Sequence, residues 1–75
     1  MLRRTEDGTH LYRIAGMDRF TELQRIGKRW VMHVVEARAY PEKVRIVEMV
    51  HGDNGRYLPL SEGEWEAVFR TLEQV

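Results

Sequence analysis

The chain has 75 residues, of which 12 are lysine or arginine and 12 are aspartate or glutamate, and it has no cysteine. A chain of this length forms one domain with a small core, and disulfides cannot staple it. The net charge of zero excludes a general electrostatic attraction to nucleic acid, although the first 60 residues carry +3 and the last 15 carry −3. We therefore expect a single domain over residues 1–75, stabilised by forming a homodimer.

Apolar runs in the sequence are short. None approaches the roughly 20 residues of a membrane span, and the opening Met1-Leu2-Arg3-Arg4 is not followed by the apolar segment of a secretory signal. The lack of cysteine is compatible with a reducing compartment. We expect a cytoplasmic protein that makes no membrane contact.

The N-terminal third predicts an arm followed by strands. Residues 1–8 are polar and aperiodic, which indicates a loose arm. Residues 9–15 place β-formers between two glycines and predict a strand. Residues 16–27 carry an apolar side chain at every third position, which fits neither strict strand alternation nor a narrow helical stripe. Asp18 could cap a short helical turn, and the alternative is a second strand. The strand is favoured because it would form a hairpin with the next run.

Residues 28–39 form the longest β-rich run, and both faces of the predicted strand are apolar. One face carries Trp30, Met32 and Val34, and the other carries Val31, Val35 and Ala37. A strand of this kind is typically covered on both sides. Since a single helix covers one face of a sheet, we expect the other face to meet the N-terminal segment, a second subunit or a ligand.

The next segment predicts a second hairpin. Residues 40–43 suit a turn with proline at its second position, and residues 43–50 alternate imperfectly as a strand. Asn54-Gly55 is a strong signal for a two-residue β-hairpin turn. The following strand, residues 56–60, contains Pro59, which places it at the edge of a sheet.

The last segment predicts a helix. Ser61 and Glu64 have the spacing of a capping box, and Leu60 and Trp65 that of a hydrophobic staple. One apolar stripe follows, made of Trp65, Val68, Phe69, Leu72 and Val75. The predicted fold is α+β, an antiparallel sheet of four or five strands followed by one C-terminal helix packed on one face.

The residues give little support for catalysis or metal binding. The three histidines are scattered without the spacing of a zinc site, and the one serine, Ser61, is used in the predicted cap. The sequence lacks both a cysteine nucleophile and a glycine-rich phosphate loop. We expect a protein that is not an enzyme and that needs no metal or cofactor.

Cations and aromatic rings are interleaved along the predicted strands, an arrangement that suits single-stranded DNA or RNA because bases stack on rings and phosphates follow the charge. The alternative is that these residues solvate an ordinary sheet surface. The candidate nucleic-acid-binding residues are Arg25, Lys28, Arg29, Arg38, Arg45, Arg56 and Tyr57.

The C-terminal half, from the Lys43-Val44-Arg45-Ile46 strand through Gly55-Arg56-Tyr57-Leu58-Pro59-Leu60 to Ser61-Glu62-Gly63-Glu64-Trp65, resembles the transcriptional coactivator family typified by positive cofactor four. The resemblance implies a curved four-stranded sheet with a helix, a homodimer joined partly through the helices, and single-stranded DNA or RNA held on the sheet. It also implies that Arg56 stands in the place of the family's basic residue before the last strand, with Arg45 on the strand before it.

A second hypothesis follows from the apolar faces of residues 28–39. A neutral chain too small to cover both faces could use one of them to bind another protein. The protein would then be a small protein–protein interaction regulator, such as a phage-type inhibitor.

Overall fold

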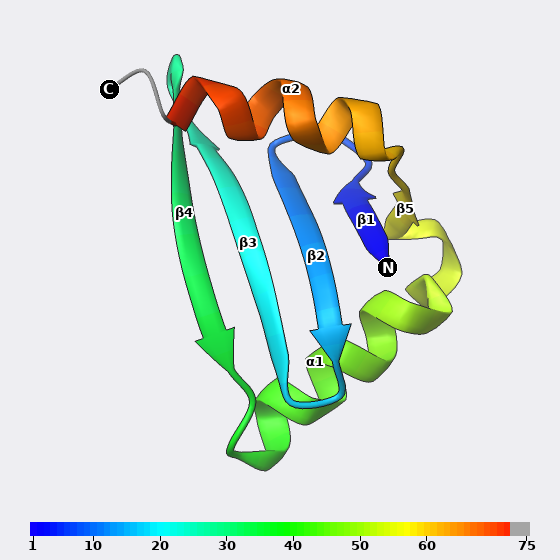
Figure 1. Cartoon of the computed structure of the whole chain (residues 1–75). Helices are drawn as coiled ribbons and strands as arrows, with labels where there is room; N and C mark the ends of the chain where they lie inside the picture. Colours follow the sequence, from blue (N-terminus) through cyan, green and yellow to red (C-terminus); the bar gives the residue numbers. More distant parts are fainter. Residues whose placement is uncertain (73–75) are drawn as a thin grey trace.

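The computed structural model describes residues 1–72, which form one antiparallel sheet and two α-helices (Figure 1). The sheet has the strand order β4-β3-β2-β1-β5. The elements in chain order are β1 (Leu2–Thr5), β2 (His10–Gly16), β3 (Arg19–Ile26), β4 (Arg29–Glu36), α1 (Tyr40–His51), the 3-10 turn η1 (Asp53–Gly55), β5 (Tyr57–Pro59) and α2 (Glu62–Leu72). The α+β class and the antiparallel sheet are as predicted, with a second helix in addition.

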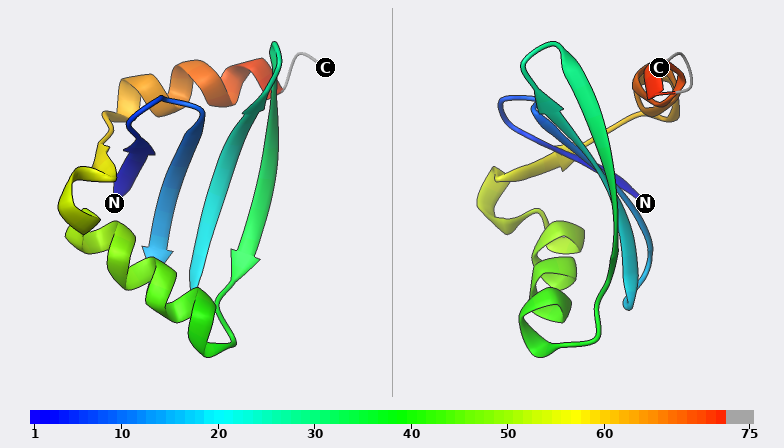
Figure 2. Two further views of the ribbon diagram at one scale, coloured as in Figure 1. Left: turned by 180° about the vertical axis from the view of Figure 1, so that it is seen from behind. Right: turned by 90° about the vertical axis from the view of Figure 1, so that its left-hand side faces the viewer.

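The two helices pack on opposite faces of the sheet, as the edge-on view of Figure 2 shows. Side chains alternate between the faces along each strand, so β3 is buried on both sides, with Phe20 and Leu23 fully inaccessible. The core on the α1 side consists of Tyr12, Ile14, Phe20, Ala37, Ile46 and Met49. The core on the α2 side consists of Leu2, Leu11, Leu23, Leu60 and Trp65. One thin sheet therefore separates two small cores.

The prediction of a loose arm over residues 1–8 is wrong. Residues 2–5 form β1, which lies between β2 and β5 in the sheet. Leu2 is buried in the α2-side core, and on the other face the Arg3 guanidinium donates to the carbonyl oxygens of Met49 (3.0 Å) and Val50 (3.2 Å). These carbonyls lie in the last turn of α1, where a cation is favourable. The Arg3 side chain thus links β1 to α1.

The predicted turn at residues 40–43 and the predicted strand at 43–50 are also wrong, because both belong to α1. Pro41 lies in the first helical turn, and the Glu42 carboxylate accepts a hydrogen bond from the Ala39 N–H at 2.8 Å. Gly52 ends the helix with a φ of 85°, a conformation that glycine adopts at helix C-termini. Ile46 and Met49 are buried one helical turn apart, and this packing outweighs the β-propensity of the segment's valines.

The Asn54-Gly55 signal marks a turn but not a hairpin. Asn54 and Gly55 do adopt positive φ values, 57° and 88°. The segment preceding them is helical, however, so there is no strand there for β5 to pair with. The turn instead connects α1 to β5, and β5 pairs with β1.

The prediction that residues 28–39 form a strand covered on both sides is wrong in its second part. They form β4, which is the outermost strand of the sheet, and most of its side chains are exposed. The strands that are covered on both faces are its neighbour β3 and the next strand, β2. The prediction for Pro59 is confirmed, because β5 lies at the other edge of the sheet.

Helix α2 begins as its sequence predicts. The Ser61 hydroxyl oxygen accepts a hydrogen bond from the Glu64 N–H at 3.1 Å, and the Glu64 carboxylate contacts the same hydroxyl rather than the Ser61 amide. Leu60 and Trp65 are both buried in the α2-side core, with Val68, Phe69 and Leu72 packed against it; Val75 lies outside the described residues. Neither helix in residues 1–72 combines the length and apolar character needed to cross a membrane.

Candidate interaction site at the open strand edge

Three of the candidate nucleic-acid-binding residues lie together at the β3–β4 turn. Arg25 pairs in register with Trp30, and Ile26 pairs with Arg29 across the Gly27-Lys28 turn. The Arg25 Nε donates to the Gly27 carbonyl at 3.1 Å. Arg25, Lys28 and Arg29 are all exposed, so the tip of this hairpin is a compact cationic surface.

The structure does not bring the other candidate residues to this tip. Arg38 follows the far end of β4 and forms an ion pair with Glu36 at 2.6 Å. Arg56 and Tyr57 lie near the opposite edge of the sheet, where Arg56 pairs with Asp53 at 3.6 Å. The Tyr57 ring packs edge-on against Tyr12 with 5.7 Å between centroids, so it serves the α1-side core. The seven candidates therefore do not form one surface.

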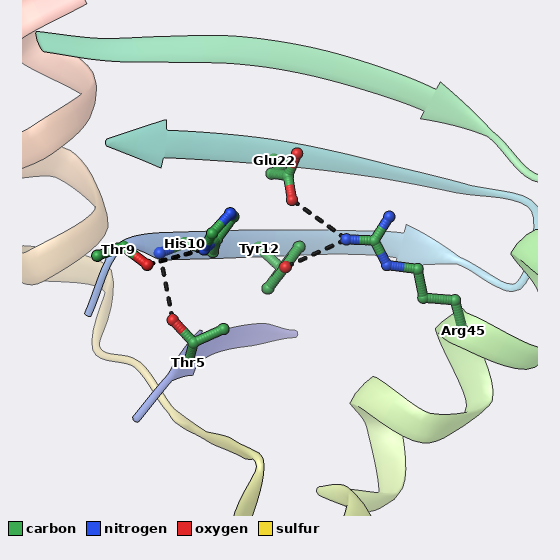
Figure 3. A network of polar contacts seen from close by, with 6 residues as sticks. All are labelled: Thr5, Thr9, His10, Tyr12, Glu22 and Arg45. Atoms are coloured by element: carbon green, nitrogen blue, oxygen red, sulfur yellow. Dashed lines mark hydrogen bonds and ion pairs between the residues drawn. The ribbon is translucent and has the colours of Figure 1, made fainter. Parts of the chain in front are cut away.

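Arg45 belongs to a network that fastens α1 to the sheet (Figure 3). One terminal nitrogen of its guanidinium lies 3.2 Å from the Tyr12 hydroxyl and 3.2 Å from a carboxylate oxygen of Glu22. The guanidinium carbon also lies 5.6 Å from the centroid of the Tyr12 ring and 5.3 Å from that of Phe20. The Glu22 side chain is only 12% exposed, so Arg45 balances a largely buried carboxylate. Its role is structural in this arrangement.

Glu22 is a residue of this network that has no signal in the sequence alone. Its partner Tyr12 lies opposite it on the neighbouring strand, a relation that is visible only once the β2–β3 register is known. With that register, a carboxylate beside a buried tyrosine indicates that a cation from another element must approach. That other element is α1, which supplies Arg45; the sequence predicts a strand in its place.

Burial raises the pKa of Tyr12 from 10.0 to about 12, against the opposing effect of the hydrogen bond from Arg45. The folded state therefore holds the phenol proton more tightly than the unfolded state does. This contribution to stability is complete below pH 10 and is lost as the pH rises from about 10 toward about 12.

The free energy of unfolding should therefore decrease over this alkaline interval. The decrease should be smaller in the Tyr12→Phe variant, because phenylalanine has no proton to release. Urea unfolding followed at a series of pH values from neutral to alkaline measures the effect. Tyr40→Phe is the matched control, since the Tyr40 side chain is 80% exposed. A Tyr12→Phe profile that is parallel to the wild-type profile would show that this tyrosine does not contribute.

The largest exposed apolar surface on a strand belongs to β4. Val31, Met32 and Val34 are 36%, 48% and 59% exposed. By strand alternation Val31 lies on the α1 face and the other two lie on the α2 face. The edge of the sheet is thus apolar on both of its faces.

Within residues 1–72, no strand pairs with the outer side of β4. In a two-residue hairpin the residues flanking the turn form a hydrogen-bonded pair, so Arg29 directs its backbone groups toward β3. The Ala37 N–H, eight residues on, donates to the Asp18 carbonyl at 2.7 Å and continues this alternation. The residues between them with even numbers therefore point their N–H and C=O groups outward: Trp30, Met32, Val34 and Glu36.

The middle of β4, between Arg29 and Glu36 at its ends, lacks the devices that commonly protect an edge strand. Its register with β3 runs unbroken from residue 29 to residue 36, and residues 30–35 include neither proline nor a lysine, arginine or acidic side chain. The opposite edge differs, because β5 has three residues and contains Pro59. Proteins usually blunt an exposed edge with short strands, proline or charge. The sheet is therefore protected at β5 and open at β4.

Within residues 1–72, no group of three or more histidine, cysteine or acidic side chains is arranged to hold a metal ion. Comparison of the chain with protein-family models, with curated proteins and with solved structures finds no match.

Proposed function

We propose that this protein is a binding module that pairs the open edge of β4 with an extended segment of another polypeptide. The observation that carries the proposal is the eight-residue outer strand, which no other strand of residues 1–72 pairs on its outer side and which exposes Val31 on one face and Met32 and Val34 on the other. The protein acts by binding and not by catalysis.

The physical basis is the addition of a strand to a sheet. The outward backbone groups of β4 supply main-chain hydrogen bonds, and the alternate side chains supply specificity. Val31 on one face and Met32 and Val34 on the other would be removed from water by the added strand, and such burial contributes roughly 25 cal/mol per Å² of apolar surface. Both contributions come from the same strand.

A photo-crosslinking amino acid placed at position 34, with expression in cells, tests the proposal. The expected result is a covalent adduct with a defined polypeptide, identified by mass spectrometry and abolished when Met32, whose N–H points outward, is also replaced by proline. The control is the same amino acid at Glu66, an exposed position on α2. Position 34 yielding no more adduct than position 66 would contradict the proposal.

A second candidate function, the binding of single-stranded DNA or RNA in a transcription-related role, is favoured by the three cations at the β3–β4 turn. Labelled single-stranded oligonucleotide should bind at low salt, and the affinity should fall steeply as salt is added. Replacing Arg25, Lys28 and Arg29 together with alanine should abolish this binding, whereas Arg38→Ala combined with Arg56→Ala should not. Indifference to the triple substitution would overturn this candidate.

A further inference from the structure

We infer that the polypeptide bound by β4 is the β4 strand of a second copy of this chain, joined antiparallel about a two-fold axis that passes midway between the two Met32 residues. The inference rests on the proposed function and names its partner. It joins two five-stranded sheets edge to edge into one continuous sheet. It differs from the dimer implied by the family resemblance, which is joined partly through the helices.

Symmetry limits the ways in which β4 can pair with itself. An antiparallel pair of identical strands is related by a two-fold axis perpendicular to the sheet, so residues opposite one another lie on the same face. The axis therefore passes midway between the two copies of one β4 residue, and that residue faces its own copy. An axis at Met32 uses the outward backbone groups of Trp30, Met32 and Val34, because these residues all lie on the hydrogen-bonding side of the free edge.

Charge complementarity selects the axis at Met32 from its neighbours. It places Lys28 of one copy opposite Glu36 of the other, and Trp30 opposite Val34 of the other. The interface then has a Met32–Met32 contact at its centre, an aromatic–aliphatic pair on each side and an ion pair at each end. Cross-strand pairs of these types are stabilising.

Registers with the axis at a neighbouring residue place less compatible side chains opposite each other. An axis at His33 brings Lys28 opposite Arg38 of the second copy, which repels, and Trp30 opposite Glu36. An axis at Val31 separates Lys28 from Glu36 and places Glu36 opposite Ile26. Like charges directly opposite each other destabilise a strand pair, so the register at Met32 combines apolar contacts with opposite charges.

Within residues 1–72, no element pairs with the free edge of β4. After β4 the chain turns away into α1 on one face of the sheet, and α2 ends beside the first residues of β4 on the other face (Figure 1). Trp30 already packs against the core beneath α2, together with Phe69 and Leu72. The proposed register places Val34 of the second copy next to Trp30, beside this end of the helix. The exposed valine thereby gains apolar neighbours.

The position of Met32 on the axis gives a specific test by charge. In the Met32→Lys variant two lysines face each other, and in the Met32→Glu variant two glutamates do. Sedimentation equilibrium should give twice the chain mass for the wild type and a single chain mass for each variant alone. An equimolar mixture of the two variants should recover the doubled mass, because lysine then faces glutamate.

The matched controls are Val47→Lys and Val47→Glu on α1, where the side chain is 41% exposed; both should keep the doubled mass. The absence of cysteine allows a second check of register. Oxidation should link the Met32→Cys variant into a covalent dimer, since Cα atoms of an opposed pair are about 5.5 Å apart. The Val34→Cys variant should stay unlinked.

A wild type with a single chain mass at every concentration would overturn self-pairing. So would a mixture of the Met32→Lys and Met32→Glu variants that remains monomeric while both variants are folded by circular dichroism. If the wild type is monomeric and position 34 crosslinks to a different protein, self-pairing fails and the proposed function stands. If it is monomeric and position 34 yields no specific adduct, both fail.

Discussion

Replacing Ile46 with alanine should lower the free energy of unfolding by about 2–5 kcal/mol, the usual cost of truncating a fully buried isoleucine. Ile46 has no exposed surface and lies in the α1-side core between the helix and the sheet. A chain of 75 residues has a total stability of roughly 4–11 kcal/mol. The variant should therefore lose a large part of its stability in urea unfolding.

Val47→Ala is the matched control, because Val47 is the next residue of α1 and is 41% exposed. Its effect should stay within about 0.5 kcal/mol, as for other surface positions. The comparison also tests the helix itself, which places Ile46 and Met49 on one face. A loss at Val47 that equals the loss at Ile46 would mean that this segment is buried on alternating sides, as a strand would be.

Trp65→Ala should be the most damaging substitution on the other side of the sheet, costing about 3–5 kcal/mol. Trp65 is 3% exposed and anchors the first turn of α2 to the core that contains Leu11 and Leu23. Its ring also stacks near Phe69 with 6.3 Å between centroids, and the Arg13 guanidinium carbon lies 5.1 Å from its centroid. Thermal unfolding followed by far-ultraviolet circular dichroism would measure the loss.

Glu66→Ala provides the control on α2, since Glu66 is exposed beside Trp65; alanine there should change the stability by no more than about 0.5 kcal/mol. An unfolding transition of the Trp65→Ala variant that matches that of Glu66→Ala would contradict the packing of α2 on the sheet. The α1-side core would then be sufficient to hold the fold.

The elements that the sequence predicts correctly are those with local signals. Ser61 and Glu64 specify the start of α2 through a side-chain cap, and Pro59 specifies an edge because it cannot donate to a neighbouring strand. The strands within residues 9–36 follow from β-formers and the glycines that punctuate them. Each of these signals acts over a few residues and does not depend on the tertiary arrangement of the rest of the chain.

Helix α1 shows why other elements could not be predicted. Its valines favour a strand, and the weaker helical signals were a proline in the first turn, a glycine after the last turn and the spacing of Ile46, Met49 and Val50. Tertiary contacts decide between these alternatives. Arg45 reaches Glu22 and Tyr12 only from a helix, and the carbonyls at the end of that helix are satisfied by Arg3 from a strand that looked like a polar arm.

The candidate site depends on the same long-range information. The sequence indicates that residues 28–39 are apolar on both faces, but it does not indicate that this run lies at an edge. That position follows from β1 and β5 being added on the other side of β2. The dispersal of the predicted cations has a similar origin, because Arg45 was expected on a strand and lies on a helix.

Residue-resolved amide hydrogen exchange along β4 tests the central claim most directly. The N–H groups of Met32 and Val34 point away from β3, so they exchange rapidly when the edge is free and slowly when a strand is added. We predict slow exchange for both amides in concentrated wild-type protein and fast exchange in the Met32→Lys variant, with the amides of β3 unchanged. Fast exchange of Met32 and Val34 in both proteins, alone and with any crosslinked partner present, would contradict the assignment of β4 as a binding edge.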